Sequence, residues 1–166
     1  MKKIMLIISV ITIFSACKKD FSAWKSYNEE MLQEFKVNLG KTLPVDTFWV
    51  SESGLLVEVY HRGQTSKMPK LNSEVECRFY KRCLVDGTPF YGKDYPVNEA
   101  FFVATQRKGL QEILCQMPEA SYFKIYVPYE LGYGKDGVKY NNFTIPPYST
   151  LIYEIEIVNV EQYPPM

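Results

Sequence analysis

The chain has 166 residues, of which 46% are apolar and 23% are charged. That is enough apolar material for one hydrophobic core and too short a chain for two full-sized domains. Without segment 1–16, which carries two lysines and no acids, the 19 basic residues fall to 17 against 19 acidic ones, a net charge of about −2. This charge balance does not predict nucleic-acid binding, which requires a basic surface.

The first residues have the pattern of an export signal. Two lysines precede an apolar run from Ile4 to Phe14, shorter than the about 20 residues of a membrane-spanning helix. A Ser-Ala pair then stands directly before Cys17, as in the lipobox of bacterial lipoproteins. We expect segment 1–16 to be removed, Cys17 to be lipidated, and residues 17–20 to form a tether. The protein would then be exported and anchored to a bacterial membrane, facing the periplasm. The alternative is an ordinary cleavable signal in which Cys17 has no role.

Residues 21–45 predict a helical extension of three to four turns. One side of it carries, at helical spacing, Trp24, Tyr27 or Asn28, Met31 and Phe35. Ser26 and Glu29 have the spacing of a capping box, and Gly40 is a stop signal. Two interpretations stay open: the helix packs on the main domain, or it joins two copies in a homodimer.

In residues 46–166 the pattern changes to short stretches that favour β-strands. Strands are expected at 47–51, 55–60, 75–84, 123–127 and 151–157. A single helix is predicted within residues 108–117, where Leu110, Ile113, Leu114 and Met117 recur at helical spacing before Pro118. Short strands with one helix on one face indicate an α+β fold with an antiparallel sheet.

The cysteines that follow Cys17 are Cys77, Cys83 and Cys115. They are odd in number and lack CxxC spacing, so they indicate neither a zinc site nor a complete disulfide framework. Buried thiols are the expected state. One disulfide could still form in an oxidising compartment.

Five segments carry a resemblance to a known family. They are SGLLVEVYHRG from Ser53, LVDGTPF from Leu84, KGLQEILCQMP from Lys108, SYFKIYVPYELGYG from Ser121 and IPPYSTLIYEIEI from Ile145. In order and spacing this set resembles the FKBP family of peptidyl-prolyl isomerases over about residues 53–161. The resemblance implies a curved antiparallel β-sheet wrapped around one short α-helix, with residues 21–45 as an N-terminal helical extension.

The resemblance also implies an activity, which is rotation about X-Pro bonds in exported, proline-containing polypeptides. No bond is broken in that reaction, so it needs no nucleophile, metal or cofactor. It needs an apolar cup that stabilises the twisted amide better than the planar one.

The residues of that cup follow from the match to the family's motifs. The catalytic set would be Tyr133, Phe90, Leu110, Ile145 and Tyr153, and the substrate-binding set would be Tyr80 or Phe79, Tyr91, Phe101 and Arg107. In the family the tyrosine matched by Tyr133 meets the substrate's backbone carbonyl. Ungapped counting puts Tyr80 in the cup, whereas the apolar alternation turns Phe79 inward, and a β-bulge would reconcile the two.

Departures from the family pattern keep other functions open. Tyr91 stands where an aspartate is common, and Gln106-Arg107-Lys108 replaces a segment that is usually apolar. These changes favour, as the first alternative, an FKBP-like binding or chaperone module with little or no turnover. A small β-barrel lipoprotein that binds a hydrophobic ligand is a third possibility.

Overall fold

The computed structural model describes residues 19–44, 46–91, 95–140 and 142–161. The predicted signal and Cys17 lie outside these residues. A six-stranded antiparallel sheet runs in the order β1-β2-β5-β8-β3-β4. Its strands are β1 (Phe48–Val50), β2 (Leu56–His61), β3 (Glu74–Leu84), β4 (Val97–Phe102), β5 (Tyr122–Val127) and β8 (Leu151–Glu161). The remaining elements are α1 (Ser22–Thr42), η1 (Val103–Thr105), α2 (Lys108–Leu114), η2 (Tyr129–Leu131), β6 (Val138–Lys139) and β7 (Thr144–Ile145).

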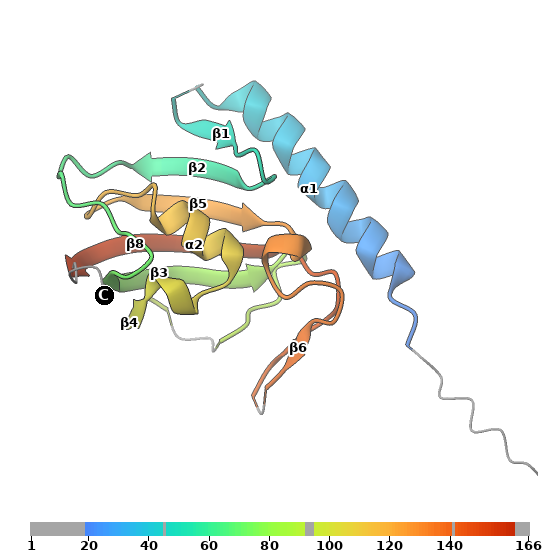
Figure 1. The fold of residues 1–166 in the computed structure, drawn as a ribbon. Coiled ribbons are helices and arrows are strands. Elements are labelled where there is room, and N and C mark those ends of the chain that lie inside the picture. Colours follow the sequence, from blue (N-terminus) through green and yellow to red (C-terminus); the bar gives the residue numbers. More distant parts are fainter. Residues whose placement is uncertain (1–18, 45, 92–94, 141, 162–166) are drawn as a thin grey trace, which may run out of the picture.

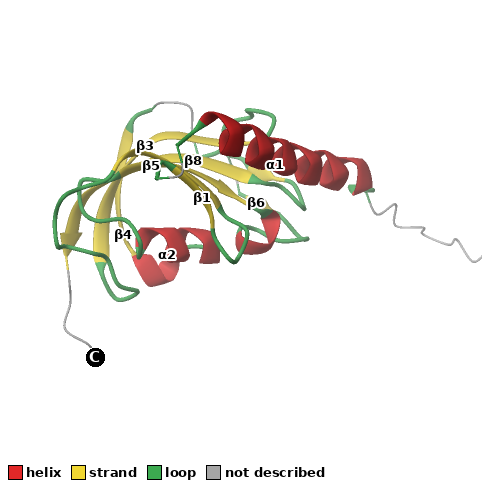
Figure 2. Ribbon diagram, turned by 90° about the horizontal axis from the view of Figure 1, so that it is seen from above, coloured by secondary structure: helices red, strands yellow, loops and turns green. Residues whose placement is uncertain are grey.

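The two α-helices cover opposite faces of this sheet. α2 lies across the inner, concave face and α1 lies across the outer face (Figures 1 and 2). The α+β prediction is confirmed, with a curved antiparallel sheet around the short helix α2. The predicted helical extension corresponds to α1.

The hydrophobic core fills the space between the sheet and α2. The central strand β8 contributes alternate residues, because its inward side chains are Leu151, Tyr153, Ile155 and Ile157, each at most 3% exposed. The buried α2 residues Leu110, Ile113 and Leu114 pack against them. Burial of each large apolar side chain contributes about 1.5–3 kcal/mol to stability. Because the apolar residues of β8 and those of α2 each lie on one side of their element, burying both sets places α2 over β8.

The sheet contains one strand that the sequence patterns missed. Strand β4 pairs with β3 at the sheet edge, from Phe79↔Val97 to Glu74↔Phe102. Its residues alternate only between half-buried and exposed, because an edge strand has a neighbour on one side. The apolar contrast along β4 is therefore too weak to show in the sequence.

Helix α1 is longer than predicted. It begins at Ser22, whose N–H donates to Asp20 Oδ1 (2.9 Å), so the predicted capping box at Ser26 lies inside the helix. It also continues through Gly40 and ends at Thr42. The physical stop is Pro44, since the residue before a proline avoids helical backbone angles and Leu43 is extended.

The apolar stripe of α1 packs on the outer face of the sheet. Leu32, Phe35 and Leu39 contact a buried cluster formed by Leu56, Cys83, Tyr126 and Ile152. The rings of Phe35 and Tyr126 are 4.9 Å apart. This is the first of the two interpretations of the helix, packing on its own domain. A homodimer through α1 stays a prediction.

Polar contacts fix the N-terminal half of α1. Asn28, which is fully buried, accepts a hydrogen bond from the Thr150 N–H at Oδ1 (2.6 Å) and donates from Nδ2 to the Trp24 carbonyl (2.8 Å). The indole N–H of Trp24 donates to Ser149 Oγ (3.0 Å). These bonds join α1 to the segment that leads into β8.

The cysteines in the described part of the chain, Cys77, Cys83 and Cys115, are free thiols. Cys77 and Cys83 are buried and Cys115 is half-buried. Burial raises the pKa of all of them, which keeps the thiols protonated and unreactive. The expectation of unpaired, largely buried thiols is confirmed.

Helix α1, with 21 residues, is long enough to cross a membrane but carries several charged residues. Within the described residues, no helix combines the length and apolarity that a membrane crossing requires.

Candidate functional site

A cavity of about 440 Å³ opens on the concave side of the sheet, between α2 and the strands β3 and β4, of which β4 forms the sheet edge. It is within the size range of small-ligand pockets. Its lining comes from β3, β4, α2, β8 and loop segments, and consists of Phe79, Arg82, Tyr91, Glu99, Ala100, Phe101, Gln106, Arg107, Leu110, Tyr133 and Tyr153. Of the predicted site residues, seven line this cavity, namely Phe79, Tyr91, Phe101, Arg107, Leu110, Tyr133 and Tyr153.

The floor of the cavity is apolar and aromatic. Leu110 enters it from the first turn of α2, and Tyr153 enters from the centre of β8. The ring of Phe79 lies 6.3 Å from the rings of both Tyr153 and Phe101. Because these side chains come from a helix and three paired strands, the floor is rigid.

A β-bulge decides between Phe79 and Tyr80. The register of β3 against β8 shifts between Phe79 and Lys81, so Phe79 is buried in the floor while Tyr80 is on the outer face. There the Tyr80 hydroxyl donates to Glu156 Oε2 (2.8 Å). Phe79 therefore lines the cavity and Tyr80 does not. Ungapped counting pointed to Tyr80 because it does not account for the inserted residue.

Phe90 and Ile145 are behind the cavity wall rather than on it. Both are 1% exposed, and neither is among the lining side chains. The Phe90 ring meets the Tyr153 ring edge-on, with centroids 5.6 Å apart. The resemblance predicted that these two residues touch the substrate, whereas the structure places them in the core, where they support Tyr153 and the β6–β7 hairpin.

Two tyrosines meet at the mouth of the cavity. The hydroxyls of Tyr91 and Tyr133 are hydrogen-bonded (2.7 Å), and the Tyr91 ring packs on Phe143 (4.3 Å). Burial first, and then the bond to Tyr133, raises the pKa of Tyr91, so its hydroxyl keeps its proton at neutral pH. Tyr91 has a φ of 60°, a conformation that costs about 1–3 kcal/mol in a non-glycine residue.

Sequence reasoning missed an ion pair in the wall between the buried Arg82 and the half-exposed Glu99. The Arg82 guanidinium lies 4.5 Å from the Phe79 ring centroid and 4.9 Å from that of Tyr91. It donates to both carboxylate oxygens of Glu99 (3.0 and 2.8 Å). The signal for this pair was cross-strand charge complementarity, which is visible only once β4, the strand that carries Glu99 and Ala100, is known.

Arg107 lies at the rim, just before α2. Its guanidinium is 4.5 Å from the Tyr133 ring centroid. Burial alone would lower the pKa of Arg107, but the nearby hydroxyls of Tyr133 and Tyr140 outweigh it and raise the pKa. Arg107 is therefore always charged.

Tyr153 brings a hydroxyl into the floor. Burial raises its pKa, so it stays protonated. Every fully buried side-chain nitrogen or oxygen among the described residues has a hydrogen-bond partner. The Tyr153 side chain is one of those that line the cavity.

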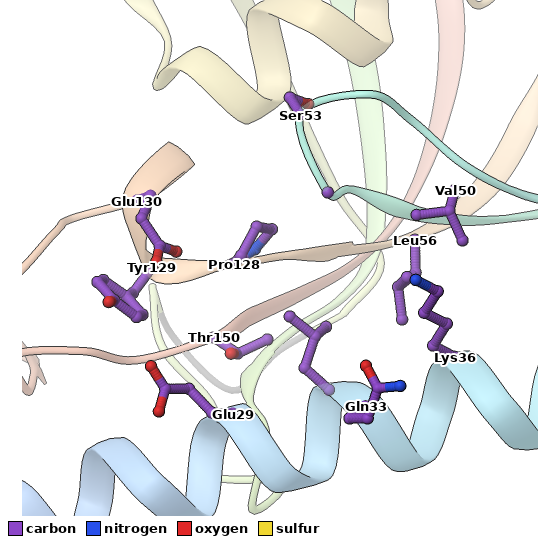
Figure 3. A pocket seen from close by; sticks show the side chains of 12 residues that line it. Glu29, Gln33, Lys36, Val50, Ser53, Leu56, Pro128, Tyr129, Glu130 and Thr150 are labelled. Atoms are coloured by element: carbon purple, nitrogen blue, oxygen red, sulfur yellow. The ribbon is translucent and has the colours of Figure 1, made fainter.

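A second cavity, of about 460 Å³, lies between α1 and the outer face of the sheet. Figure 3 shows Glu29, Gln33 and Lys36 of α1 facing Pro128, Glu130 and Thr150 across it. Its walls mix the charged or polar side chains of α1 with apolar residues such as Leu32, Val50 and Leu56, and Tyr129 is the one aromatic residue in its lining. The described residues also contain no group of three or more His, Cys, Asp or Glu side chains that could hold a metal ion.

Comparison with known proteins identifies the family. The family model described as FKBP-type peptidyl-prolyl cis-trans isomerase matches residues 65–158. The chain belongs to this FKBP family. The matched segment contains every residue that lines the inner cavity, whereas helix α1, which forms one wall of the outer cavity, precedes it.

Individual FKBP relatives agree with this assignment. The chain is 31% identical to the FKBP-type peptidyl-prolyl cis-trans isomerase FkpA of Escherichia coli over 140 residues, 82% of this chain and 48% of the relative. It is 33% identical to the peptidyl-prolyl cis-trans isomerase Mip of Coxiella burnetii over 113 residues, 66% of this chain and 46% of the relative. The chain thus spans about half the length of the curated relatives it matches.

A solved FKBP structure has the same fold. The crystal structure of FkpA from Escherichia coli superposes with a TM-score of 0.71 at 26% identity. The similarity covers 86% of this chain and 63% of that chain. The structural similarity covers more of this chain than the family model, which matches residues 65–158.

Proposed function

We propose that this protein is a peptidyl-prolyl cis-trans isomerase that rotates X-Pro bonds in exported polypeptides and so assists their folding. The barrier to rotation is about 18–20 kcal/mol. Uncatalysed exchange consequently takes about 10–100 s, slow enough to limit folding.

One observation carries the proposal. Within the segment that matches the FKBP family, an apolar and largely aromatic floor of Phe79, Phe101, Leu110 and Tyr153 shares the cavity with Tyr133. A proline ring is apolar and fits such a floor, while a hydroxyl at its edge can donate to a backbone carbonyl. The apolar ring of the substrate is thus matched by the floor, and its polar amide is matched by the hydroxyl.

The catalytic step is a difference in binding. During rotation the amide nitrogen loses conjugation with the carbonyl, so the twisted amide tolerates an apolar surround better than the planar one does. The Tyr133 hydroxyl would hold the carbonyl of the residue before proline while the ring turns. To donate to it, Tyr133 must act as acceptor toward Tyr91 or exchange that partner for the substrate.

A second candidate is a binding or chaperone module with little turnover. The Tyr91–Tyr133 bond (2.7 Å) favours it, because a substrate carbonyl competes with Tyr91 for the same hydroxyl. The buried Arg82 also makes one wall polar. Such a module would bind X-Pro peptides without accelerating their isomerisation.

We also propose that the protein is exported and held on a bacterial membrane by acylation of Cys17. The lysine pair, apolar run and Ser-Ala-Cys sequence support it. Replacement Cys17→Ser should release the protein from membrane fractions, and unchanged membrane association would contradict the anchor.

The folding role can be tested on a protein whose refolding is limited by proline isomerisation. Catalytic amounts of the protein should accelerate the slow phase. Tyr133→Phe should lower the acceleration about threefold to tenfold, the value of one hydrogen bond. Tyr80→Phe removes a hydroxyl from the outer face and is the matched control, which should retain full acceleration. A slow phase unchanged by the wild-type protein would refute the isomerase assignment.

A further inference from the structure

We infer that Arg107 makes the pocket select X-Pro bonds in which the residue before proline is acidic. The inference rests on the proposed prolyl-binding function and adds a substrate class to it. Its basis is the arrangement of charge around the cavity, where two guanidinium groups lie. A carboxylate neutralises the charge of Arg82 in the wall, whereas no carboxylate among the described residues pairs with Arg107 at the rim.

The neutralised charge is that of Arg82. It is 4% exposed and donates to both oxygens of Glu99. The two charges cancel at short range and contribute little to the field in the cavity. This pair shapes the wall without attracting a charged substrate.

The rim charge, that of Arg107, differs from this. Among the residues that the structure describes, no carboxylate forms an ion pair with Arg107. Its contacts are uncharged: the guanidinium is stacked 4.5 Å from the centroid of the Tyr133 ring, and the hydroxyls of Tyr133 and Tyr140 lie close to it. A guanidinium has five N–H donors, more than these two hydroxyls can occupy, and pairs of such donors bind carboxylates.

The position of Arg107 next to Tyr133 indicates which residue of the substrate it contacts. Tyr133 would hold the carbonyl of the residue before proline, and the Cα of that residue is bonded directly to this carbonyl carbon. Its side chain therefore starts beside the Tyr133 ring, on which Arg107 lies. A Glu or Asp side chain is long enough to reach a guanidinium stacked there, whereas a Lys side chain would be repelled.

The experiment compares peptides that differ in one charge. Equilibrium dissociation constants and kcat/KM are measured with the full-length protein for Ala-Glu-Pro-Phe, Ala-Gln-Pro-Phe and Ala-Lys-Pro-Phe peptides. Gln has the shape of Glu without its charge, so the Glu-to-Gln ratio isolates electrostatics. A half-exposed pair is worth about 1 kcal/mol, so we expect Glu to bind about fivefold more tightly than Gln at low salt. The ratio should shrink in 0.5 M salt.

Variants assign the effect to one residue. Arg107→Gln should bring the Glu-to-Gln ratio to one, and Arg107→Glu should make the Lys peptide the preferred one. Lys108→Gln removes the same charge from the neighbouring position, outside the lining, and should keep most of the preference. Because each variant is read as a ratio between peptides, a general loss of activity does not obscure it.

The outcomes separate the two proposals. Equal dissociation constants for Glu and Gln in the wild-type protein would overturn the acidic preference, even if turnover is fast. A preference that survives Arg107→Gln would also overturn it. Selective binding of the Glu peptide without any turnover would uphold the preference and refute the isomerase activity instead.

Discussion

Replacing Asn28 by Ala tests how α1 is attached to the sheet. Asn28 is fully buried and its Oδ1 is the partner of the Thr150 N–H, at 2.6 Å. Thr150 itself is 1% exposed, so water cannot readily replace the lost acceptor. A buried donor left without a partner costs about 1–3 kcal/mol.

The other bond of Asn28 adds little to this cost. Its Nδ2 donates to the Trp24 carbonyl (2.8 Å), which also accepts the ordinary helical hydrogen bond and so stays satisfied. We therefore expect Asn28→Ala to lower the free energy of unfolding by about 2 kcal/mol. For a chain of this size the melting temperature should fall by about 4–8 °C.

The same helix supplies the control. Asn38 is exposed and its amide has only a long contact with Glu34 Oε1 (3.4 Å). Asn38→Ala should change stability by less than about 0.5 kcal/mol. Urea unfolding of the three proteins, followed by circular dichroism, gives the comparison. If Asn28→Ala and Asn38→Ala unfold at the same urea concentration, the proposed buried link between α1 and β8 is wrong.

Two further predictions concern packing and pH. A Cβ at Gly109 would lie 2.6 Å from Val127 Cγ1, so Gly109→Ala should destabilise by about 1–3 kcal/mol. In Gly40→Ala the nearest atom is 3.7 Å away and helix propensity should stabilise by up to about 1 kcal/mol; the opposite order of the two unfolding midpoints would contradict the packing described for α2. Partial burial of Tyr60, which is 48% exposed, together with the charges of Glu58 and Glu154, raises its pKa from 10.0 to about 12. The folded protein thus keeps a proton that the unfolded chain loses, so this part of the stability is complete below about pH 10 and is lost toward pH 12. The urea concentration at the unfolding midpoint should fall between about pH 10 and pH 12, and it should fall less in Tyr60→Phe. If the midpoint falls equally steeply with pH in both proteins, Tyr60 is not a source of the pH dependence.

Strong periodicity made most of the fold predictable. β8 alternates large apolar residues with polar ones, and α2 repeats its apolar residues at helical spacing, so their existence and type followed from the sequence. β4 did not, because at a sheet edge its side chains are only half-buried. The end of α1 was also misplaced, since Gly40 permits a stop but Pro44 enforces one.

The site was predictable where the family motifs apply and less so where this chain departs from them. Leu110, Tyr133 and Tyr153 could be located by motif. The bulge at Tyr80 could only be suspected, since bulges follow from strand pairing and not from local sequence. The Arg82–Glu99 pair joins two strands, and one of them was unknown, so the polar wall of the pocket required the structure.

The most direct test of the isomerase account is exchange NMR on an Ala-Glu-Pro-Phe peptide with a substoichiometric amount of the protein. Without catalyst, exchange over about 10–100 s is too slow to give cross-peaks between the cis and trans forms. The account predicts such cross-peaks with the wild-type protein and clearly weaker ones with Tyr133→Phe. Peptide resonances that shift on binding while the cis and trans forms do not exchange would contradict it and establish a binding module instead.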